Sequence, residues 1–420
     1  MSDPVMDTMN FLNEITLRYP EAISFAPGRP YDGLFDVEQI FAHIRRYLDH
    51  LALQGESPAG IREALFQYGP TAGRIRELIA GSLRADEDIQ VPAESIVVTV
   101  GCQEAMFLTL RVLFSRREDV LLVSSPSYVG ITGAARLLGI EPVAVVEHED
   151  GLSCADVEVA VAVELAAGRR PRAIYVTPDH SNPSGVTMPL RTRHELLDLA
   201  ARHDLLILED SPYRLVSQGT RLPTLKSLDR ARRVVHLGSY SKTVFPGARV
   251  GFAVADQTVV DTAGRSGLLA DELAKVKSMV TVNTSPLGQA VIAGALLESA
   301  GRISDLNDET AKYYGDTLRT TLRCLDRVLP PVRRARLGVG WNRPSGGFFL
   351  TLKVPFRADN AALARSAQDF GVIWTPMSYF YPQGGGERGI RLSTSYLTHD
   401  EIESGIARLA EFIASASEDS

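Results

Sequence analysis

Gly238-Ser-Tyr-Ser-Lys242-Thr-Val-Phe-Pro-Gly-Ala-Arg249 is the segment that decides the fold, because it joins two apolar, β-branched runs at residues 234–238 and 250–255. Two serines, a lysine and an arginine in a loop at a strand end predict an anion bound beside a reactive amine. In open α/β sheets, ligands bind at the carboxyl ends of the strands. The segment therefore indicates a sheet with a ligand site along one edge.

Five further runs of the same kind precede this segment, at residues 96–100, 119–123, 142–146, 173–177 and 205–209. Short runs rich in Val, Ile and Leu are typical of strands buried on both faces, as in parallel sheets. Amphipathic stretches between them, such as 103–114 and 190–203, supply crossover helices. We therefore predict an α/β fold whose large domain, residues 50–302, holds a seven-stranded, mainly parallel sheet.

The pattern changes after about residue 303. The last part of the chain holds a long polar helix pattern, two short apolar runs and a final helix pattern, at residues 305–329, 346–353, 389–394 and 399–415. Residues 303–420 are therefore predicted to form a smaller α+β domain. Residues 1–49 are predicted to be an N-terminal arm whose Pro- and Gly-rich stretch, residues 25–31, is a loop. We expect this arm to contribute to the small domain and to the substrate site.

The overall composition excludes several classes of protein. The 420 residues are 45% hydrophobic and carry a formal charge of -7, which gives no basis for binding nucleic acid or an anionic membrane. No stretch approaches the ~18 apolar residues of a membrane span, and the first twenty residues hold no apolar leader. Three scattered cysteines, Cys102, Cys154 and Cys324, form neither a disulfide framework nor a metal site. We therefore expect a cytoplasmic enzyme that acts on small molecules, without a metal.

Lysine is rare in this chain, so chemistry that needs an amine has few candidates. Only six of the 44 basic residues are lysines, and Lys242 alone follows two serines at a strand end. A buried lysine beside another cation has a lowered pKa and becomes nucleophilic near neutral pH. Lys242 is therefore the predicted reactive amine.

Three other strand ends carry polar groups. Gly101-Cys102-Gln103 follows one strand and opens a helix, and the N–H groups at a helix N-terminus bind phosphate. This turn lacks the glycine patterns of dinucleotide and nucleoside triphosphate sites. Asp210 ends a buried strand, where a carboxylate needs a partner. Asn182 lies in a further turn of this kind, Pro178-Asp-His-Ser-Asn182-Pro-Ser-Gly185.

Taken in this order, the four segments resemble the class I and II pyridoxal-phosphate enzymes of the aspartate aminotransferase fold, fold type I. The resemblance runs from Ile23 to about Ile413, and the Ser-x-Ser-Lys segment with Arg249 is its most specific part. It implies that Lys242 binds pyridoxal 5′-phosphate covalently and moves the substrate proton. It also implies that Asp210 pairs with the ring nitrogen, which makes the ring an electron sink.

The same resemblance implies the rest of the site. Asn182 and Tyr213 would bind the 3′ oxygen, and Tyr213 would share the catalytic work with Lys242 and Asp210. Tyr128 would stack on the ring. Arg391 would bind the substrate carboxylate, for which its planar fork is well shaped. The residues implied for the phosphate are Gly101, Cys102, Gln103, Ser239, Ser241 and Arg249.

A homodimer with a shared active site is implied by Tyr68, which matches a tyrosine that reaches the phosphate in the neighbouring subunit. Some residues depart from the family pattern. His180-Ser181 replaces an aromatic and glutamine, Cys102 stands where serine is common, and Met377 replaces a frequent glycine. We expect these departures where the substrate's shape is recognised.

Transamination between an amino acid and a 2-keto acid is the predicted reaction. Gly28 and Arg29 in the N-terminal loop, together with Asn182 and Arg391, are the predicted substrate contacts. Aromatic residues in this loop and at 379–381 suit an aromatic substrate, and residues 23–31 resemble aminotransferases for hydroxylated phenylglycines in bacterial antibiotic pathways. Arg29 could bind an acidic or phenolic group, or form a salt bridge within the loop.

Two alternatives remain open from the sequence. The same cofactor chemistry serves elimination, replacement and cyclisation, and the departures at 180, 181 and 377 favour this alternative. A cofactor-sensing transcription regulator is disfavoured because the fold is expected to begin near residue 20, with no winged helix before it.

Overall fold

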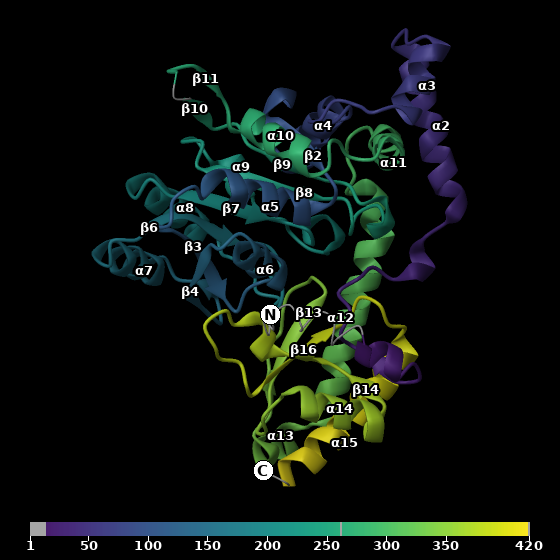
Figure 1. Ribbon diagram of the computed structural model, residues 1–420. Coiled ribbons are helices and arrows are strands. Elements are labelled where there is room, and N and C mark those ends of the chain that lie inside the picture. The colour runs from purple at the N-terminus through teal and green to yellow at the C-terminus, as the bar shows by residue number, and fades with distance from the viewer. Residues whose placement is uncertain (1–13, 261–262, 419–420) are drawn as a thin grey trace.

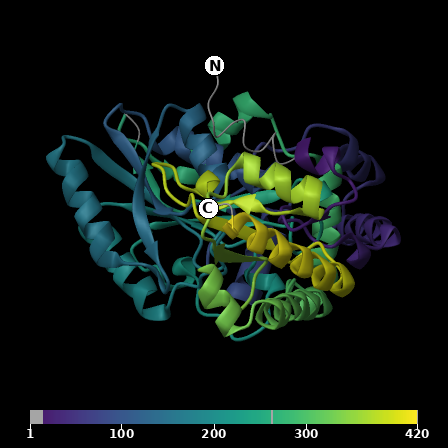
Figure 2. The same cartoon turned by 90° about the horizontal axis from the view of Figure 1, so that it is seen from below.

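The computed structural model describes residues 14–260 and 263–418. A large α/β region occupies the upper part of Figure 1, and a smaller region built from the C-terminal residues lies below it. The long helix α12 (Asp308–Val328) runs from one region to the other. Seen from below in Figure 2, the C-terminal helices lie in front of the large sheet.

Within the described residues, eight strands form the large sheet in the order β2-β9-β8-β7-β6-β3-β4-β5. The inner strands β4, β3, β6, β7 and β8 are parallel, whereas β9 is antiparallel to both β8 and β2. In sheet order the bounds are β2 Ile96–Thr99, β9 Gly251–Val254, β8 Val234–Ser239, β7 Leu206–Asp210, β6 Arg170–Val176, β3 Asp119–Ser125, β4 Glu141–His148 and β5 Gly151–Leu152.

All seven strands expected from the apolar runs are present, so the predicted α/β class is confirmed. The sheet nevertheless has eight strands. The additional strand, β5, has two residues and pairs antiparallel with the end of β4. Gly151 takes a positive φ of 102° at this tight reversal, where glycine is favoured because it lacks a Cβ. A two-residue strand has no apolar run of its own, and the sequence therefore did not reveal it.

Helices cover both faces of the large sheet. Leu121 and Val123 of β3 pack with α5, α6 and α10, whereas Val120 and Leu122 pack with α7 and α8 on the opposite face. Because both faces are buried, most positions of these strands are apolar. The bounds of the helices are α3 Pro58–Phe66, α4 Arg76–Glu87, α5 Cys102–Leu113, α6 Val129–Leu137, α7 Cys154–Ala166, α8 Leu190–Arg202, α9 Leu225–Leu228, α10 Leu269–Val280 and α11 Pro286–Glu298.

The smaller region has its own hydrophobic core around a four-stranded sheet of order β12-β13-β16-β15. The strands are β12 Gly340–Trp341, β13 Phe349–Lys353, β16 Gly389–Ser393 and β15 Thr375–Pro376, and the helices are α13 Pro331–Leu337, α14 Asn360–Phe370 and α15 His399–Glu418. The remaining short hairpin joins β10 (Thr258–Val260) to β11 (Ser266–Leu268).

The N-terminal residues contact both regions. Strand β1 (Ile23–Ser24) pairs in parallel with β14 (Val372–Ile373) of the smaller region. Helix α2 (Val37–Leu53) instead packs on α11, so closely that a Cβ at Gly294 would lie 2.0 Å from the carbonyl oxygen of His43. The predicted boundary after residue 49 falls inside this continuous helix. The start of the predicted arm, residues 1–13, lies outside the described residues.

No helix found in residues 14–260 and 263–418 is both long enough and apolar enough to span a membrane.

Candidate active site

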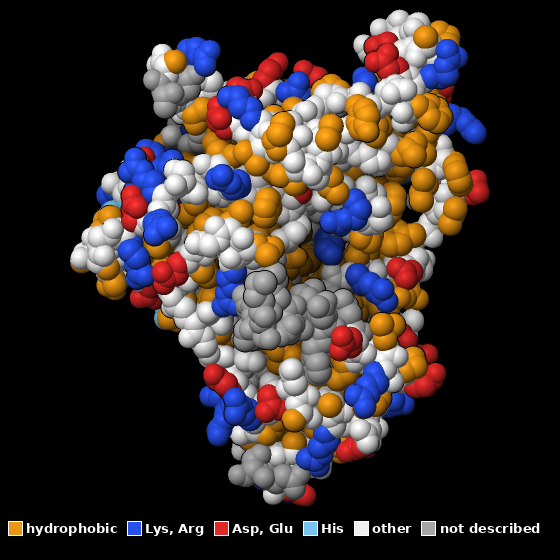
Figure 3. Space-filling view, in the orientation of Figure 1, with side chains coloured by type: hydrophobic (Ala, Val, Ile, Leu, Met, Phe, Trp, Pro, Cys, Tyr) orange, Lys and Arg blue, Asp and Glu red, His pale blue; other side chains and the backbone are white. Residues whose placement is uncertain are grey.

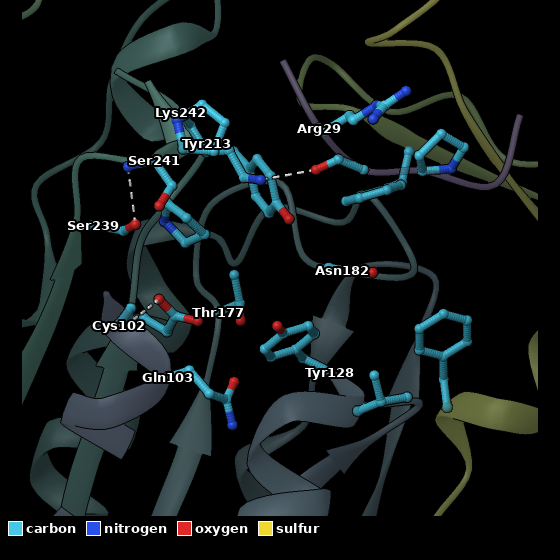
Figure 4. Close-up of a pocket in the computed structure, with 18 of the residues that line it drawn as sticks. Arg29, Cys102, Gln103, Tyr128, Thr177, Asn182, Tyr213, Ser239, Ser241 and Lys242 are labelled. Carbon is cyan, nitrogen blue, oxygen red and sulfur yellow. Dashed lines mark hydrogen bonds between the residues drawn. The ribbon is translucent and has the colours of Figure 1, made fainter. Parts of the chain in front are cut away.

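A cavity of about 660 Å³ lies at the carboxyl ends of the parallel strands. Its wall also includes the N-terminal loop and β16 of the smaller region. The structure brings thirteen of the predicted site residues to this cavity, and Figure 4 labels nine of them. These thirteen are Gly28, Arg29, Cys102, Gln103, Tyr128, Asn182, Asp210, Tyr213, Ser239, Ser241, Lys242, Arg249 and Arg391.

Two predicted residues lie outside the cavity wall. Gly101 sits directly behind it, as the residue that precedes α5. Tyr68 follows α3 and is 79% exposed. The role predicted for Tyr68 concerns a neighbouring subunit and stays a prediction.

Lys242 lies in the loop that follows β8 and points into the cavity (Figure 4). Its Nζ donates a hydrogen bond of 2.8 Å to the carbonyl oxygen of Gly28. Burial and the positive charge of Arg249 lower the pKa of Lys242 to about 8, although Asp210 opposes this shift. A substantial fraction of this amine is therefore neutral near physiological pH and able to act as a nucleophile.

Asp210 ends β7 and is buried at the floor of the cavity. Its Oδ2 accepts a hydrogen bond of 2.7 Å from the hydroxyl of Tyr175, and the Cys102 Sγ lies 3.6 Å from Oδ1. Burial raises the pKa of Asp210 to about 6, while these two donors and nearby cationic side chains favour the carboxylate. Such a carboxylate suits a cationic ring nitrogen as its partner.

The turn before α5 forms a cradle for an anion. Gly101 has a φ of 73°, and a Cβ there would lie 2.5 Å from Nη2 of Arg249. Glycine therefore allows the guanidinium to approach the N-terminus of a twelve-residue helix, where N–H groups point outward. The Ser241 N–H donates to Ser239 Oγ at 3.2 Å on the opposite side (Figure 4). An arginine beside a helix N-terminus fits a phosphate group.

Cys102 and Gln103 contribute less to this cradle through their side chains than the resemblance implied. The thiol of Cys102 faces Asp210, and Nε2 of Gln103 donates to the carbonyl oxygen of Gly130 at 2.7 Å. Their backbone N–H groups belong to the first turn of α5.

Tyr213 and Tyr128 are aromatic residues of the cavity wall. Tyr213 packs on Phe348 with a centroid distance of 5.0 Å, and Tyr213 and Asn182 both line the cavity. Burial raises the pKa of Tyr128 to about 12, so that its phenol stays neutral. Phe349 closes the wall beside Tyr213.

Arg391 of β16 is buried between two aromatic rings. Its Cζ lies 4.4 Å from the ring centroid of Phe349 and 4.8 Å from that of Phe380. One terminal nitrogen donates to Asn182 Oδ1 at 2.7 Å, and the other donates to the carbonyl oxygen of Ala26 at 2.7 Å. Nε is buried and has no hydrogen-bond partner in the described structure. Burial lowers the pKa of Arg391 to about 10, so it stays charged and fits a carboxylate.

Arg29 lies at the rim of the cavity. Its guanidinium points away from Lys242 in Figure 4 and lies 3.7 Å from the ring centroid of Tyr396. The predicted contact between Arg29 and a substrate stays a prediction. Tyr379 and Phe380 line the cavity as the predicted aromatic wall.

Three of the four departures from the family pattern lie elsewhere than expected, whereas Cys102 lines the cavity. Of the described residues that form the cavity wall, none is His180, Ser181 or Met377. His180 has a φ of 54° and packs against Gly346, where a Cβ would lie 2.8 Å from its ring. Met377 is buried among other residues. These three side chains therefore lie outside the cavity wall.

Comparison with known proteins agrees with this geometry. The family model for aminotransferase class I and II matches residues 37–409. The chain belongs to the class I and II aminotransferases. It is 47% identical to the (S)-3,5-dihydroxyphenylglycine transaminase of Amycolatopsis orientalis over 98% of this chain and 92% of that protein. It is 31% identical to the 2-aminoadipate transaminase of Thermus thermophilus, over 96% of this chain and 92% of that protein.

A solved structure gives the same result. The α-aminoadipate aminotransferase from Thermus thermophilus, complexed with N-(5′-phosphopyridoxyl)-L-leucine, has a TM-score of 0.80 and 29% identity, and covers 100% of this chain and 98% of that one. The predicted fold type I architecture, cofactor and enzyme class are therefore confirmed. This aminotransferase uses pyridoxal 5′-phosphate, which fits the amine, the buried carboxylate and the phosphate cradle described above.

Sequence reasoning missed Tyr175, which lines the cavity and binds Asp210. It lies within β6, in a run that is apolar on both faces, and no signal in the run distinguishes it from a core residue. A search for tyrosines near the ends of strands would have included it.

Proposed function

We propose that this aminotransferase exchanges an amino group between an amino acid and an aromatic 2-keto acid, of the arylglycine and arylglyoxylate type. The observation that carries the proposal is the aromatic enclosure of Arg391, where Phe349 and Phe380 flank the guanidinium that would bind the carboxylate. In an arylglycine the ring is attached to Cα, so ring and carboxylate lie close together. Aromatic walls beside the carboxylate site suit this shape. The 47% identity to a dihydroxyphenylglycine transaminase supports the same substrate class.

We assign the catalytic work to Lys242, Asp210 and Tyr213, with Asn182 as a further contact to the cofactor. When bound, pyridoxal phosphate supplies a ring that withdraws electrons from the substrate Cα. Lys242 would hold the cofactor through Nζ and then move the proton of the substrate Cα, for which an amine with a pKa near neutrality is suited. Asp210 would hold a positive charge on the ring nitrogen. Tyr213 and Asn182, which both line the cavity, would bind the ring's 3′ oxygen.

The phosphate would lie between the first turn of α5 and Arg249, with Ser239 and Ser241 on the other side. The closeness of Gly101 to Arg249 supports this placement. Tyr128 would cover the ring from the side of β3.

Absorption spectroscopy of the purified protein tests the substrate class. Arylglycines should convert the visible band of the bound pyridoxal form into the ultraviolet band of the pyridoxamine form, at lower concentrations than glutamate or tyrosine do. Conversion by every aliphatic donor and by no arylglycine would refute the substrate assignment and leave the enzyme class unchanged.

The elimination alternative loses its motivation in this structure, because the residues that favoured it, His180, Ser181 and Met377, lie outside the cavity wall. We propose that the enzyme acts in the cytoplasm, in a bacterial antibiotic pathway. The sequence features and the resemblance to phenylglycine aminotransferases support this setting.

We also propose that the enzyme is a homodimer with shared sites. Large apolar side chains are exposed on α2, α3, α10 and α11, where Figure 3 shows a broad hydrophobic surface over α10, α11 and α2. They include Phe41, Leu53, Phe66, Met279 and Leu287. An exposed apolar surface of this extent is typical of an interface. Tyr68 is exposed beside it and would reach the partner subunit's phosphate.

Subunit mixing tests the shared site. Tyr68→Ala and Lys242→Ala subunits are each expected to have little activity. In a mixed dimer, the subunit that keeps Lys242 receives Tyr68 from its partner, so mixing should restore activity at one site. No recovery in a mixture shown to contain mixed dimers would refute sharing.

A further inference from the structure

Tyr175 is a buried cavity residue to which the catalytic roles above assign nothing. It lies in β6, beside β7, and only 1% of its surface is exposed. Its hydroxyl donates to Asp210 Oδ2 at 2.7 Å, within the usual range for a bond to a carboxylate. The hydroxyl also accepts a weaker contact from Thr177 Oγ1 at 3.4 Å. Thr177 directly follows β6. Because the Tyr175 oxygen accepts from Thr177, the hydroxyl proton of Tyr175 points toward Asp210.

The two oxygens of Asp210 have unequal partners. The bond from Tyr175 to Oδ2 is short, whereas the contact of the Cys102 thiol with Oδ1 is 3.6 Å long. A thiol is a weak donor, and Tyr175 therefore provides most of the hydrogen bonding from the protein. With Oδ2 bound, the carboxylate cannot rotate freely about its bond to Cβ.

Burial makes this bond important for the charge of Asp210. Desolvation favours the neutral acid and raises the pKa of Asp210. Among the groups that lower this pKa, the hydroxyl of Tyr175 has the largest effect. Burial and the charge of Asp210 raise the pKa of Tyr175 well above its ordinary value, so the proton stays on the phenol. Tyr175 is therefore a permanent donor that leaves the carboxylate as the charged partner.

We propose that Tyr175 is a positioning residue of this aminotransferase, which holds Asp210 ionised and oriented toward the ring nitrogen of the cofactor. The inference rests on the role proposed for Asp210 and goes beyond it, because it names the side chain that holds the Asp210 carboxylate in place. It does not depend on which amino acid is the substrate.

The variant Tyr175→Phe tests this inference, because it removes one oxygen and keeps the ring. A hydrogen bond to a charged group is worth about tenfold or more in an equilibrium, so kcat should fall by about tenfold while KM changes little. Without the donor the pKa of Asp210 rises, and the acid limb of the kcat profile should move to higher pH. The visible absorption of the cofactor-loaded variant should show the same displacement of its pH titration without substrate.

Two outcomes would overturn the proposal. One is a wild-type kcat and a wild-type pH titration in Tyr175→Phe. The other is a lower kcat with an unchanged pH titration, which would indicate a structural role alone. Should the phenylalanine variant fail to fold, Tyr175→Met removes the same hydroxyl with a flexible apolar side chain and is judged by the same two measurements.

Matched variants separate this inference from the proposed function. Tyr47→Phe makes the same change at a buried tyrosine of α2, outside the cavity wall, and should retain wild-type kinetics and spectra. Asp210→Asn should lose most activity. Wild-type activity in Asp210→Asn would refute the proposed role of Asp210 together with this inference, whereas an impaired Asp210→Asn beside an unaffected Tyr175→Phe would refute this inference alone.

Discussion

Replacing Arg391 by alanine should remove recognition of the substrate carboxylate. The guanidinium is fixed by Asn182 and the carbonyl oxygen of Ala26, and it is flanked by Phe349 and Phe380. Its unpartnered Nε shows that one donor is still available. Charge-assisted hydrogen bonds contribute about 1.5–3 kcal/mol each. The loss of a guanidinium that binds the carboxylate should therefore cost about 1.5–3 kcal/mol, or roughly 10- to 150-fold in kcat/KM.

The assay compares two amines that differ only in the carboxylate, phenylglycine and benzylamine. The rate of cofactor conversion with each is measured by stopped-flow absorption. Arg391→Ala should lower kcat/KM for phenylglycine and leave the slow reaction of benzylamine nearly unchanged. Arg391→Lys, which keeps a charge without the planar fork, should fall between wild type and Arg391→Ala. An equal loss for both amines would refute the reasoning, because it would mean that Arg391 maintains only the shape of the site.

Three other predictions follow from single contacts. The rate at which the apoprotein takes up pyridoxal phosphate should rise with pH and level off above about 8. The pKa of Lys242 is lowered to that value, and only the neutral amine reacts. A rate that keeps rising to pH 10 in stopped-flow mixing would contradict this prediction. Gly101→Ala should weaken cofactor binding by at least about tenfold in an equilibrium titration, since the new Cβ would press on Arg249 and the positive φ would be strained. Lys277→Ala should lower the free energy of unfolding by about 3–5 kcal/mol. The buried ammonium of Lys277 lies 2.7 Å from Glu104, and without it the negative charge of Glu104 has lost its partner. A urea denaturation curve equal to that of the wild type would rule out this prediction.

Much of the fold could be predicted from the sequence because seven strands of the large sheet coincide with short, mostly apolar runs. The same property hides which face a residue occupies. Ile174 and Val176 pack on one face of β6, whereas Tyr175 between them packs on the other. All three are apolar or aromatic, so no alternation shows which of them faces the helix that carries Cys102. The hydrogen bond from Tyr175 to Asp210 therefore became visible only in three dimensions.

The site could be predicted where chemistry requires one residue type, as for Lys242 and Asp210 at strand ends and for Arg391 within β16. Prediction failed where a residue's importance depends on what lies behind it. His180, which differs from the family pattern, packs against the glycines at 346 and 347, in a part of the chain more than 160 residues away. A difference from relatives that fills the interior cannot be distinguished in the sequence from one that faces a substrate.

The loop of residues 26–29 holds the catalytic groups through its main chain. Its carbonyl oxygens accept hydrogen bonds from three side chains far away in sequence: Ala26 from Arg391, Gly28 from Lys242 and Arg29 from Ser395. Carbonyl oxygens are the same whichever side chain the residue carries. The side chains at Pro27 and Arg29, which also line the cavity, can therefore change over evolutionary time without losing these contacts. Directed evolution toward new amino acids is best begun at these two positions, where sequence diversity is compatible with an intact catalytic apparatus.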